Sequence, residues 1–198
     1  MRLFVLTRHA NSTLNAQGRV NGDPGVPVPL TDEGRAAAER LGQQLAEQPF
    51  DLCVHTRFAR TRETADVILA GRDVPRLEEP LLDDIDVGDL EGATLEAYRA
   101  WKLAHPRDEP FPGGESLDDA ARRYAVAFAR LAARPERAIL VVCHEIGMRY
   151  ALNGAAGSSD LDAPARRIPN ATPYLFDGAA LGRAAEQVAL LAGNPSNG

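Results

Sequence analysis

The stretch "RLFVLTRHAN", residues 2–11, is a short apolar run that ends directly at an arginine and a histidine. Because the run is aliphatic, aromatic and β-branched, it predicts a buried β-strand over residues 2–7. The run "AILVVC" at 138–143 has the same character and is followed at once by His144. A third run, "DLCV" at 51–54, precedes an arginine-rich segment. Each predicted strand is therefore followed by side chains that can carry positive charge.

Segments with helical periodicity separate these strands, and several begin at a Ser or Thr that can cap a helix. The predicted helices cover residues 31–48, about 60–69, 94–104, from 116 onward and 146–152. Strands that alternate with helices predict a three-layer α/β/α domain with a mostly parallel central sheet. Ligands of such sheets bind beyond the carboxyl ends of the strands. We therefore expect the functional site at that edge.

The C-terminal part predicts two late strands, "PYLF" at 173–176 and "QVALL" at 187–191. Asp177-Gly178 lies between them and is typical of a tight turn. Near the N-terminal side, residues 18–29 are dense in Gly and Pro, which favours a structured loop or lid over a regular element.

The composition is that of a globular protein, with 44% hydrophobic and 25% charged residues. A net charge of -6 argues against a nucleic-acid or anionic-membrane partner. The two cysteines, Cys53 and Cys143, lie in apolar stretches without metal-ligand spacing and predict buried, reduced thiols. No leader or membrane-spanning run is evident, so we expect a cytoplasmic protein. Residues 1–193 are predicted to form one domain, and residues 194–198 a disordered tail.

The fold class gathers Arg8, His9, Arg60 and His144 at one edge of the sheet, because each follows a predicted strand. Such a group of cations repels itself unless an anion lies among its members. A phosphate or sulfate ester fits best, since guanidinium groups bind its oxygens in pairs. A nucleotide-binding fold is disfavoured because neither GxGxxG nor a Walker-type loop follows any predicted strand.

Five segments occur here in an order and spacing found in a known family. They are "TRHANSTLN", "TRFARTRETA", "LLDDIDVGDLEG", "GGESLDDAARRY" and "VVCHEIGMRYAL". Together they resemble the histidine phosphatase superfamily, which includes the cofactor-dependent phosphoglycerate mutases and many small phosphatases. The resemblance spans roughly residues 2–153 and implies a phosphoglycerate mutase-like fold.

The resemblance also implies roles for individual residues. His9 resembles the nucleophile that forms a covalent phosphohistidine. Arg8, Arg60 and His144 resemble the clamp that neutralises the phosphoryl oxygens. Asn15, six residues after His9 as in the family, would add an amide donor. The resemblance implies no metal and no cofactor, because fixed cations take the place of Mg²⁺.

A proton donor for the leaving group is expected in the acidic segment. The family places a glutamate four residues before a glycine that aligns with Gly88, and Asp84 occupies that position here. Asp84 would act first as general acid and then as general base. Aspartate is one methylene shorter than glutamate, so Asp83, Asp86 and Glu91 remain alternatives.

Several positions depart from the family pattern. Ala10-Asn11 replaces the common Gly-Glu, and Glu145 follows His144 where glycine is usual. A Glu145 side chain that points inward would weaken anion binding. Arg57 stands where proline is frequent and would face the substrate as a further cation. Glu115-Ser116 is typical of a helix cap, and Glu115 is also a candidate for the rim of the pocket.

The resemblance therefore predicts a metal-independent phosphatase of the small phosphatase branch, which hydrolyses phosphate monoesters through a phosphohistidine on His9. The alternatives are a phosphoglycerate mutase-type phosphoryl transfer and a catalytically weak protein that binds or senses a phospho-ligand. The family's mutases carry a longer segment where only residues 93–114 intervene here, which favours the phosphatase. A metal-dependent hydrolase is disfavoured, because HxH and HExxH spacings are missing from the sequence. The expected partner is a small phosphorylated substrate, and the oligomeric state is left open, a dimer included.

Overall fold

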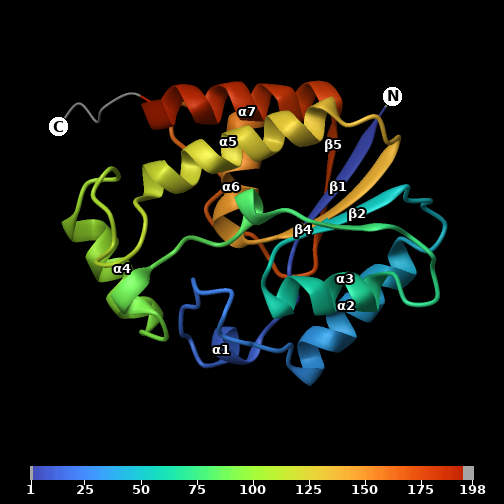
Figure 1. Ribbon diagram of the computed structural model, residues 1–198, viewed down its shortest axis with the longest axis horizontal. Coiled ribbons are helices and arrows are strands. Elements are labelled where there is room, and N and C mark those ends of the chain that lie inside the picture. Colours follow the sequence, from blue (N-terminus) through green and yellow to red (C-terminus); the bar gives the residue numbers. More distant parts are fainter. Residues whose placement is uncertain (1, 194–198) are drawn as a thin grey trace.

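The computed structural model describes residues 2–193. Its centre is a five-stranded sheet with the strand order β3-β2-β4-β1-β5 (Figure 1). The strands are β1 (Leu3–Arg8), β2 (Leu52–His55), β3 (Arg76–Glu78), β4 (Ala138–Cys143) and β5 (Pro173–Asp177). The first four run parallel, and β5 pairs antiparallel with β1. The predicted α/β fold with a mostly parallel sheet is confirmed, whereas β3 was not predicted.

The register of β1 and β4 places the ends of both strands side by side. Arg8 pairs with Cys143, so His9 and His144 leave the sheet at the same edge. The backbone N–H of His9 donates to the carbonyl of Cys143 at 2.9 Å, which continues the pairing by one residue. Both strands are central and covered on both faces, which explains their continuous apolar runs.

Seven helices surround the sheet within the part of the chain that the structure describes. They are α1 (Thr13–Ala16), α2 (Asp32–Gln44), α3 (Ala59–Ile68), α4 (Leu95–Ala104), α5 (Leu117–Ala133), α6 (Glu145–Ala155) and α7 (Gly178–Gly193). α2 and α3 pack together on one face of the sheet, and α5, α6 and α7 pack together on the other (Figure 1). Each face has its own apolar core, which gives the predicted three layers.

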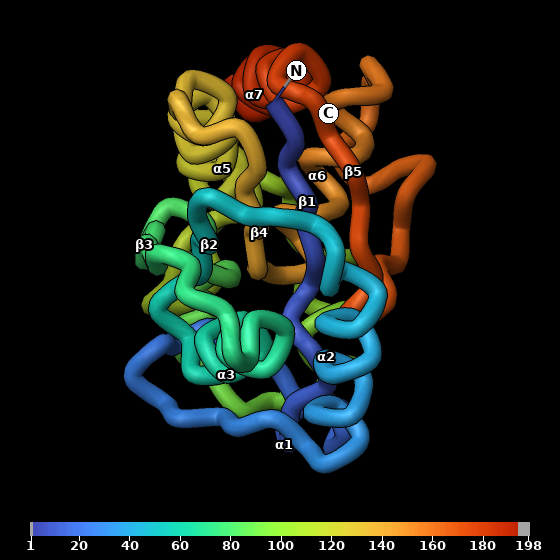
Figure 2. The backbone as a smooth tube through the Cα atoms, turned by 90° about the vertical axis from the view of Figure 1, so that its right-hand side faces the viewer, coloured from blue at the N-terminus to red at the C-terminus, as the bar shows by residue number. Residues whose placement is uncertain are grey.

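The direction of β1 identifies the functional edge of the sheet. Figure 2 shows β1 running from the N-terminus beside α7 towards α1, which lies beyond the carboxyl end of the strand. Two short 3₁₀ turns, Pro80–Leu82 and Gly88–Leu90, and helix α4 follow β3 in the chain. The acidic segment lies within this stretch.

The C-terminal segment differs from the sequence-based prediction. "PYLF" is in β5 as expected, but residues 187–191 belong to helix α7 rather than to a strand. Asp177 does not form a hairpin turn with Gly178; its side chain accepts the N–H of Ala180 at 2.7 Å at the start of α7. Buried positions along α7 recur at spacings of three and four, and this face packs on α5 and α6. The predicted tail, 194–198, lies outside the described residues.

Both cysteines are buried and unpaired, as predicted. Burial raises the pKa of each thiol to about 12, so neither is a thiolate at neutral pH. None of the described helices combines the length and the apolar character that a membrane span requires.

Candidate active site

A cavity of about 320 Å³ opens beyond the carboxyl ends of β1 and β4. Five of the residues predicted for the site line it, namely Arg8, His9, Asn15, Arg60 and Asp84. His144 is fully buried behind them and contacts Arg60 and Asp84. The structure therefore brings together residues from four separate segments of the chain, as the sheet topology predicts.

His9 is buried and held in one tautomer. Its Nδ1 lies 2.8 Å from the carbonyl oxygen of Ala10, an acceptor, so Nδ1 carries the ring proton. Nε2 is then unprotonated, and it accepts the Nε–H of Arg60 at 3.0 Å. Burial, followed by the charges of Arg60 and Arg8, lowers the pKa of His9 well below its ordinary value. The imidazole is neutral at physiological pH, as a nucleophile must be.

The backbone around His9 is fixed by hydrogen bonds to two distant parts of the chain. The side chain of Asn170 donates to the carbonyl of His9 at 2.6 Å. The N–H of Ala10 donates to the hydroxyl of Thr64, which in turn donates to the carbonyl of Arg60. The strand end that carries His9 is thus tied to the first turns of α3, where Arg60 begins the helix.

Arg60 is the centre of the polar network, with 3% of its surface exposed. Its guanidinium donates to Asn21 through both the side-chain and backbone oxygens, and to Asp84 Oδ2 at 3.0 Å. It also donates to Nδ1 of His144 at 3.1 Å and stacks over the ring of Phe58 at 4.2 Å. An incoming phosphate would exchange several of these acceptors for its own oxygens.

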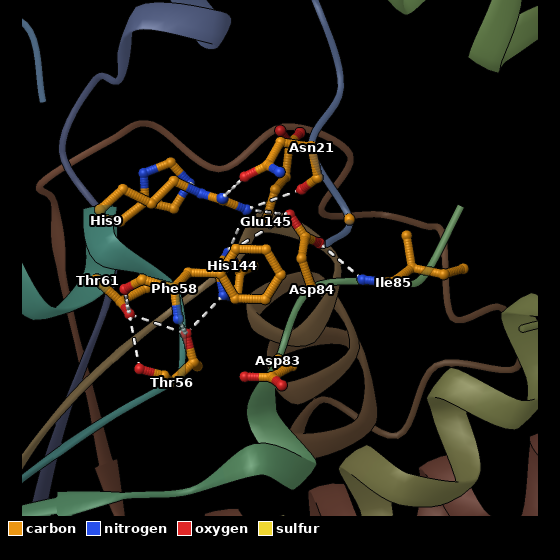
Figure 3. Close-up of polar contacts among 12 residues, drawn as sticks. His9, Asn21, Thr56, Phe58, Thr61, Asp83, Asp84, Ile85, His144 and Glu145 are labelled. Carbon is orange, nitrogen blue, oxygen red and sulfur yellow. Dashed lines mark hydrogen bonds and ion pairs between the residues drawn. The ribbon is translucent and has the colours of Figure 1, made fainter. Parts of the chain in front are cut away.

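His144 is held by a chain of hydrogen bonds from its far side (Figure 3). Because a guanidinium only donates, Nδ1 of His144 is an acceptor and Nε2 carries the proton. Nε2 donates to the hydroxyl of Thr56 at 2.9 Å, and Thr56 is 2.8 Å from the hydroxyl of Thr61. Thr61 donates to the carbonyl of Phe58. This bond sets the donor-to-acceptor direction of every hydrogen bond in the series from His144 to Phe58. Burial, then the charge of Arg60, lowers the pKa of His144 well below its ordinary value.

Asp84 is the one carboxylate of the acidic segment that lines the cavity (Figure 3). Its Oδ2 lies 3.0 Å from Arg60 and 3.4 Å from Nδ1 of His144. Burial raises the pKa of Asp84 above its ordinary value, although Arg60 and other donors oppose the shift. A raised carboxyl pKa favours the protonated form that a general acid needs.

The three alternative acids have other partners. Asp83 pairs with Arg57 through its backbone N–H at 3.0 Å and through its guanidinium. Asp86 accepts the N–H of Gly88, and Glu91 accepts backbone N–H groups from the 18–29 loop. Asp83 and Asp86 fix backbone geometry away from the cavity, and Glu91 holds the N–H of Gly22 in the cavity wall, so Asp84 is the only one of the four acids that itself lines the cavity.

Glu115 lies outside the cavity lining, in contrast to the rim position expected from the sequence. Its carboxylate binds the guanidinium of Arg123 at 2.5 Å. Arg123 donates to the carbonyls of Leu81, Asp83 and Asp84, at 3.0, 2.7 and 2.9 Å. Glu115 therefore acts on the backbone of the acidic segment through Arg123. It is a positioning residue for Asp84.

Gly88 lies within the acidic segment at a position that has no room for a side chain. Its φ is +50°, and a Cβ atom there would lie 2.1 Å from the carbonyl oxygen of Pro112. Any side chain would push the acidic segment away from the 112–114 loop. The glycine used to align Asp84 is thus required by close backbone packing.

The other two predicted binding residues differ in their placement. Asn15 lines the cavity; its side-chain oxygen accepts the N–H of Ser12 in a capping box, which leaves its amide N–H groups available. Arg57 does not line the cavity, because its guanidinium pairs with Asp83. Two residues that the sequence did not indicate, Asn21 and Thr56, bond directly to Arg60 and His144. Thr56 follows β2 directly, so the expectation that site residues follow the carboxyl ends of the strands could have identified it.

Glu145 points into the cavity and pairs with Arg8 at 2.7 Å. Arg8 also donates to the carbonyl of Ile168 at 2.8 Å. A phosphate that approaches Arg8 therefore competes with a carboxylate that is already in place. The departure from glycine at position 145 thus adds a negative charge to the wall of an anion site.

Replacing Glu145 by glutamine is expected to strengthen competitive inhibition by inorganic phosphate about three- to tenfold. The amide keeps an oxygen for Arg8 but removes the charge that repels the anion. Inhibition constants of both proteins at constant ionic strength measure the effect. Glu186→Gln, on the exposed face of α7, makes the same charge change away from the cavity and should leave the constant unchanged. Equal or weaker inhibition in Glu145→Gln would contradict the expectation.

The buried histidines predict how stability depends on pH. Because the folded-state pKa values of His9 and His144 are lowered, the unfolded chain binds protons below pH 6.5 that the folded chain excludes. The free energy of unfolding should therefore fall as the pH drops from 6.5 to 5.5, by up to about 1 kcal/mol per histidine. Urea unfolding in phosphate-free buffer measures this. His105→Asn, a change outside the cavity, should leave the slope intact; a flat profile in the unmodified protein would refute the prediction.

This fold and site define a class of protein, a three-layer α/β protein in which a buried histidine pair and two arginines face an anion cavity. The chain belongs to the histidine phosphatase superfamily (branch 1), whose family model matches residues 4–188.

Named relatives support the assignment. The chain is 32% identical over 154 residues to adenosylcobalamin/alpha-ribazole phosphatase of Salmonella typhimurium, covering 73% of this chain and 74% of the relative. It is 32% identical over 189 residues to human 6-phosphofructo-2-kinase/fructose-2,6-bisphosphatase 4, and the match covers 88% of this chain. It spans only 38% of the length of that human protein. The crystal structure of the alpha-ribazole phosphatase from Shigella flexneri has the same fold, with a TM-score of 0.78, 24% identity and coverage of 88% of this chain and 90% of that one.

Proposed function

We propose that this protein is a metal-independent phosphatase that hydrolyses phosphate monoesters through a phosphohistidine on His9. The observation that carries the proposal is the fixed tautomer of His9, which leaves Nε2 without a proton at the cation-lined cavity, where Arg60 is its hydrogen-bond donor until a phosphoryl group takes that place. Relatives named as phosphatases support phosphoryl hydrolysis.

The first chemical step transfers the phosphoryl group to the enzyme. Nε2 of His9 attacks phosphorus, the bond to the ester oxygen breaks, and the leaving alkoxide takes the proton of Asp84. Arg8 and Arg60 neutralise the equatorial oxygens while charge moves across the group. Nδ1 keeps its proton and its bond to Ala10, so the positive charge that develops on the ring is spread towards a carbonyl oxygen.

The second step returns the enzyme to its starting state. Asp84, now a carboxylate, removes a proton from water, and the water oxygen attacks phosphorus as the bond to Nε2 breaks. Inorganic phosphate leaves, and both Asp84 and His9 recover their initial protonation. The raised pKa of Asp84 suits both roles, because the group must gain and lose a proton near the working pH.

Hydrolysis of an aryl phosphate in excess EDTA tests the proposal. We expect turnover to persist in the chelator, because fixed cations supply the charge stabilisation. A labelled phosphoenzyme that is labile to acid and stable to base should accumulate when the reaction is quenched. Activity that disappears in EDTA and returns with a divalent cation would overturn the proposal.

A phospho-ligand binding protein with weak turnover is the second candidate, and the pairing of Glu145 with Arg8 favours it. That candidate predicts saturable binding of a phosphate ester without a burst of product. A phosphoglycerate mutase-type transfer predicts instead that 2,3-bisphosphoglycerate phosphorylates the enzyme and is required for exchange between phosphoglycerates. One panel of esters with and without 2,3-bisphosphoglycerate separates the three.

A further inference from the structure

The cavity holds far more positive charge than one phosphate group needs. Eight of its lining residues are Arg or Lys and two are acidic, so positive charges exceed negative charges by six. A phosphate monoester carries about two negative charges at neutral pH. The whole chain has a net charge of -6, so this concentration of cations is opposite in sign to the protein.

Five of the six additional cations come from one wall of the cavity, and the sixth, Arg19, donates to the carbonyl of Gly92. Arg99 and Lys102 are on α4, Arg149 is on α6, and Arg166 and Arg167 are on the segment 158–172 that links α6 to β5. Within residues 2–193, only Arg149 of these five forms an ion pair, with Asp162 at 3.1 Å. The proposed phosphoryl site uses none of them.

Two buried polar groups on this wall have no hydrogen-bond partner among the described residues. They are the hydroxyl of Tyr98 and the Nε–H of Arg149. Both residues line the cavity. A buried polar atom without a partner costs free energy, and a polar ligand in the cavity would supply the missing bonds. This observation is independent of the charge count and points to the same wall.

The segment that carries Arg166 and Arg167 is held in place by buried bonds. The side chain of Asn153, 1% exposed, accepts the N–H of Ala165 at 2.9 Å and donates to the carbonyls of Leu161 and Ala165. Arg149 donates to the carbonyl of Arg166 at 3.2 Å. The two exposed arginines are therefore presented from a fixed backbone, as a binding subsite requires.

We propose that the cavity takes phosphate monoesters that carry a second anionic group, and that Lys102, Arg149, Arg166 and Arg167 bind that group. This inference rests on the proposed phosphatase function and narrows its substrate class. The second group is a carboxylate or another phosphate, since both match guanidinium donors in pairs. The cavity volume of about 320 Å³ suits a small molecule rather than a macromolecule.

The charges around Lys102 also favour an anion at this wall of the cavity. Burial and the neighbouring cations Arg149 and Arg107 lower the pKa of Lys102, and Asp162 opposes the shift. An anion beside the ammonium group would favour its charged form. A substrate without a second anionic group leaves these cations facing one another without a counter-charge. The site therefore discriminates against singly anionic esters through unpaired charge, and favours doubly anionic esters through direct attraction.

Two matched pairs of substrates test the inference. The first compares 3-phosphoglycerate with glycerol 3-phosphate, and the second compares propane-1,3-diol bisphosphate with propyl phosphate. We expect kcat/KM to be at least tenfold higher for the doubly anionic member of one pair. The pair that shows the preference identifies the second group as a carboxylate or as a phosphate. The double variant Arg166→Gln/Arg167→Gln should reduce that preference about tenfold through KM for the doubly anionic substrate.

The control carries the same loss of charge elsewhere. Arg40→Gln/Arg130→Gln lies on the exposed faces of α2 and α5 and should keep the full preference. The inference is overturned if kcat/KM of the unmodified protein is the same for both members of each pair. It is also overturned if the Arg166 and Arg167 variant lowers kcat/KM equally for both members of a pair. Calorimetric binding of the same four compounds separates the two proposals: preference in affinity without any turnover would reject the phosphatase and retain the second subsite.

Discussion

Replacing His9 by alanine is expected to abolish turnover, with kcat falling about 10⁴-fold or more. Alanine removes the lone pair that attacks phosphorus, and no other histidine among residues 2–193 lines the cavity, since His144 is fully buried behind it. Enzymes that lose a covalent nucleophile typically lose factors of this size. Steady-state hydrolysis of an aryl phosphate measures the loss, and quenching in base with labelled substrate should detect no phosphoenzyme in the variant.

The His9→Ala variant should still fold and bind phosphate. The histidine is buried but neutral, and its removal leaves Arg60 with its bonds to Asn21 and Asp84. Inhibitory phosphate binding measured by thermal shift is therefore the control for an intact pocket. His105→Ala should keep full activity. A His9→Ala protein that retains more than about 1% of the turnover would show that the phosphoryl group is accepted elsewhere.

The sequence was sufficient for four of the five strands of the sheet and for His9, Arg60 and His144 at its edge. Buried parallel strands have continuous apolar sequences, which makes them recognisable. Because ligands of such sheets bind beyond the carboxyl ends of the strands, the residues that follow these strands, His9, Arg60 and His144, could be grouped from the sequence. α7 was misread in part because "QVALL" is a short apolar run, for which periodicity alone cannot separate strand from helix. Its helical face is evident only together with Leu181 and Ala184 upstream.

The partners of the site residues could not be read from the sequence. Asn21 lies in an irregular loop, where no periodicity fixes which side chain faces inward, yet it accepts two bonds from Arg60. Arg57 and Glu115 were predicted near substrate because of their place in motifs. The structure gives each an opposite charge on a neighbouring segment instead, and such long-range pairing depends on packing.

The site combines a net positive cavity with a neutral histidine pair, and these two features depend on each other. Burial and the cations around His9 and His144 keep both rings neutral, while Asp84 and Glu145 balance part of the charge when no anion is bound. Binding of a phosphate dianion replaces these internal carboxylates as the counter-charge, and Asp84, released from Arg60, takes up the proton that it donates in the proposed mechanism. The acidic side chains therefore tune affinity as well as chemistry, which makes Asp84 the most informative residue after His9.

Replacing Asp84 by asparagine is expected to affect substrates according to their leaving group. For an alkyl phosphate, kcat should fall about 10²- to 10⁴-fold, because the departing alkoxide finds no proton donor. For an aryl phosphate with a good leaving group, phosphorylation of His9 should stay fast while hydrolysis of phosphohistidine slows, since asparagine cannot take a proton from water. Rapid-mixing experiments should therefore show a burst of phenol that approaches one equivalent of enzyme. KM for phosphate esters should fall, because Arg60 loses a competing carboxylate.

The alternative acids provide the sharpest comparison for Asp84→Asn. Asp86→Asn keeps an oxygen for the N–H of Gly88, and Glu91→Gln keeps one for the 18–29 loop, so neither change should disturb the fold. If Asp84 donates the proton, both of these variants retain the ratio of alkyl to aryl turnover seen in the unmodified protein, and Asp84→Asn alone changes it. A selective loss of alkyl turnover in Asp86→Asn or Glu91→Gln, with Asp84→Asn unaffected, would transfer the role to that residue. The leaving-group ratio is decisive because a merely structural defect lowers both rates together.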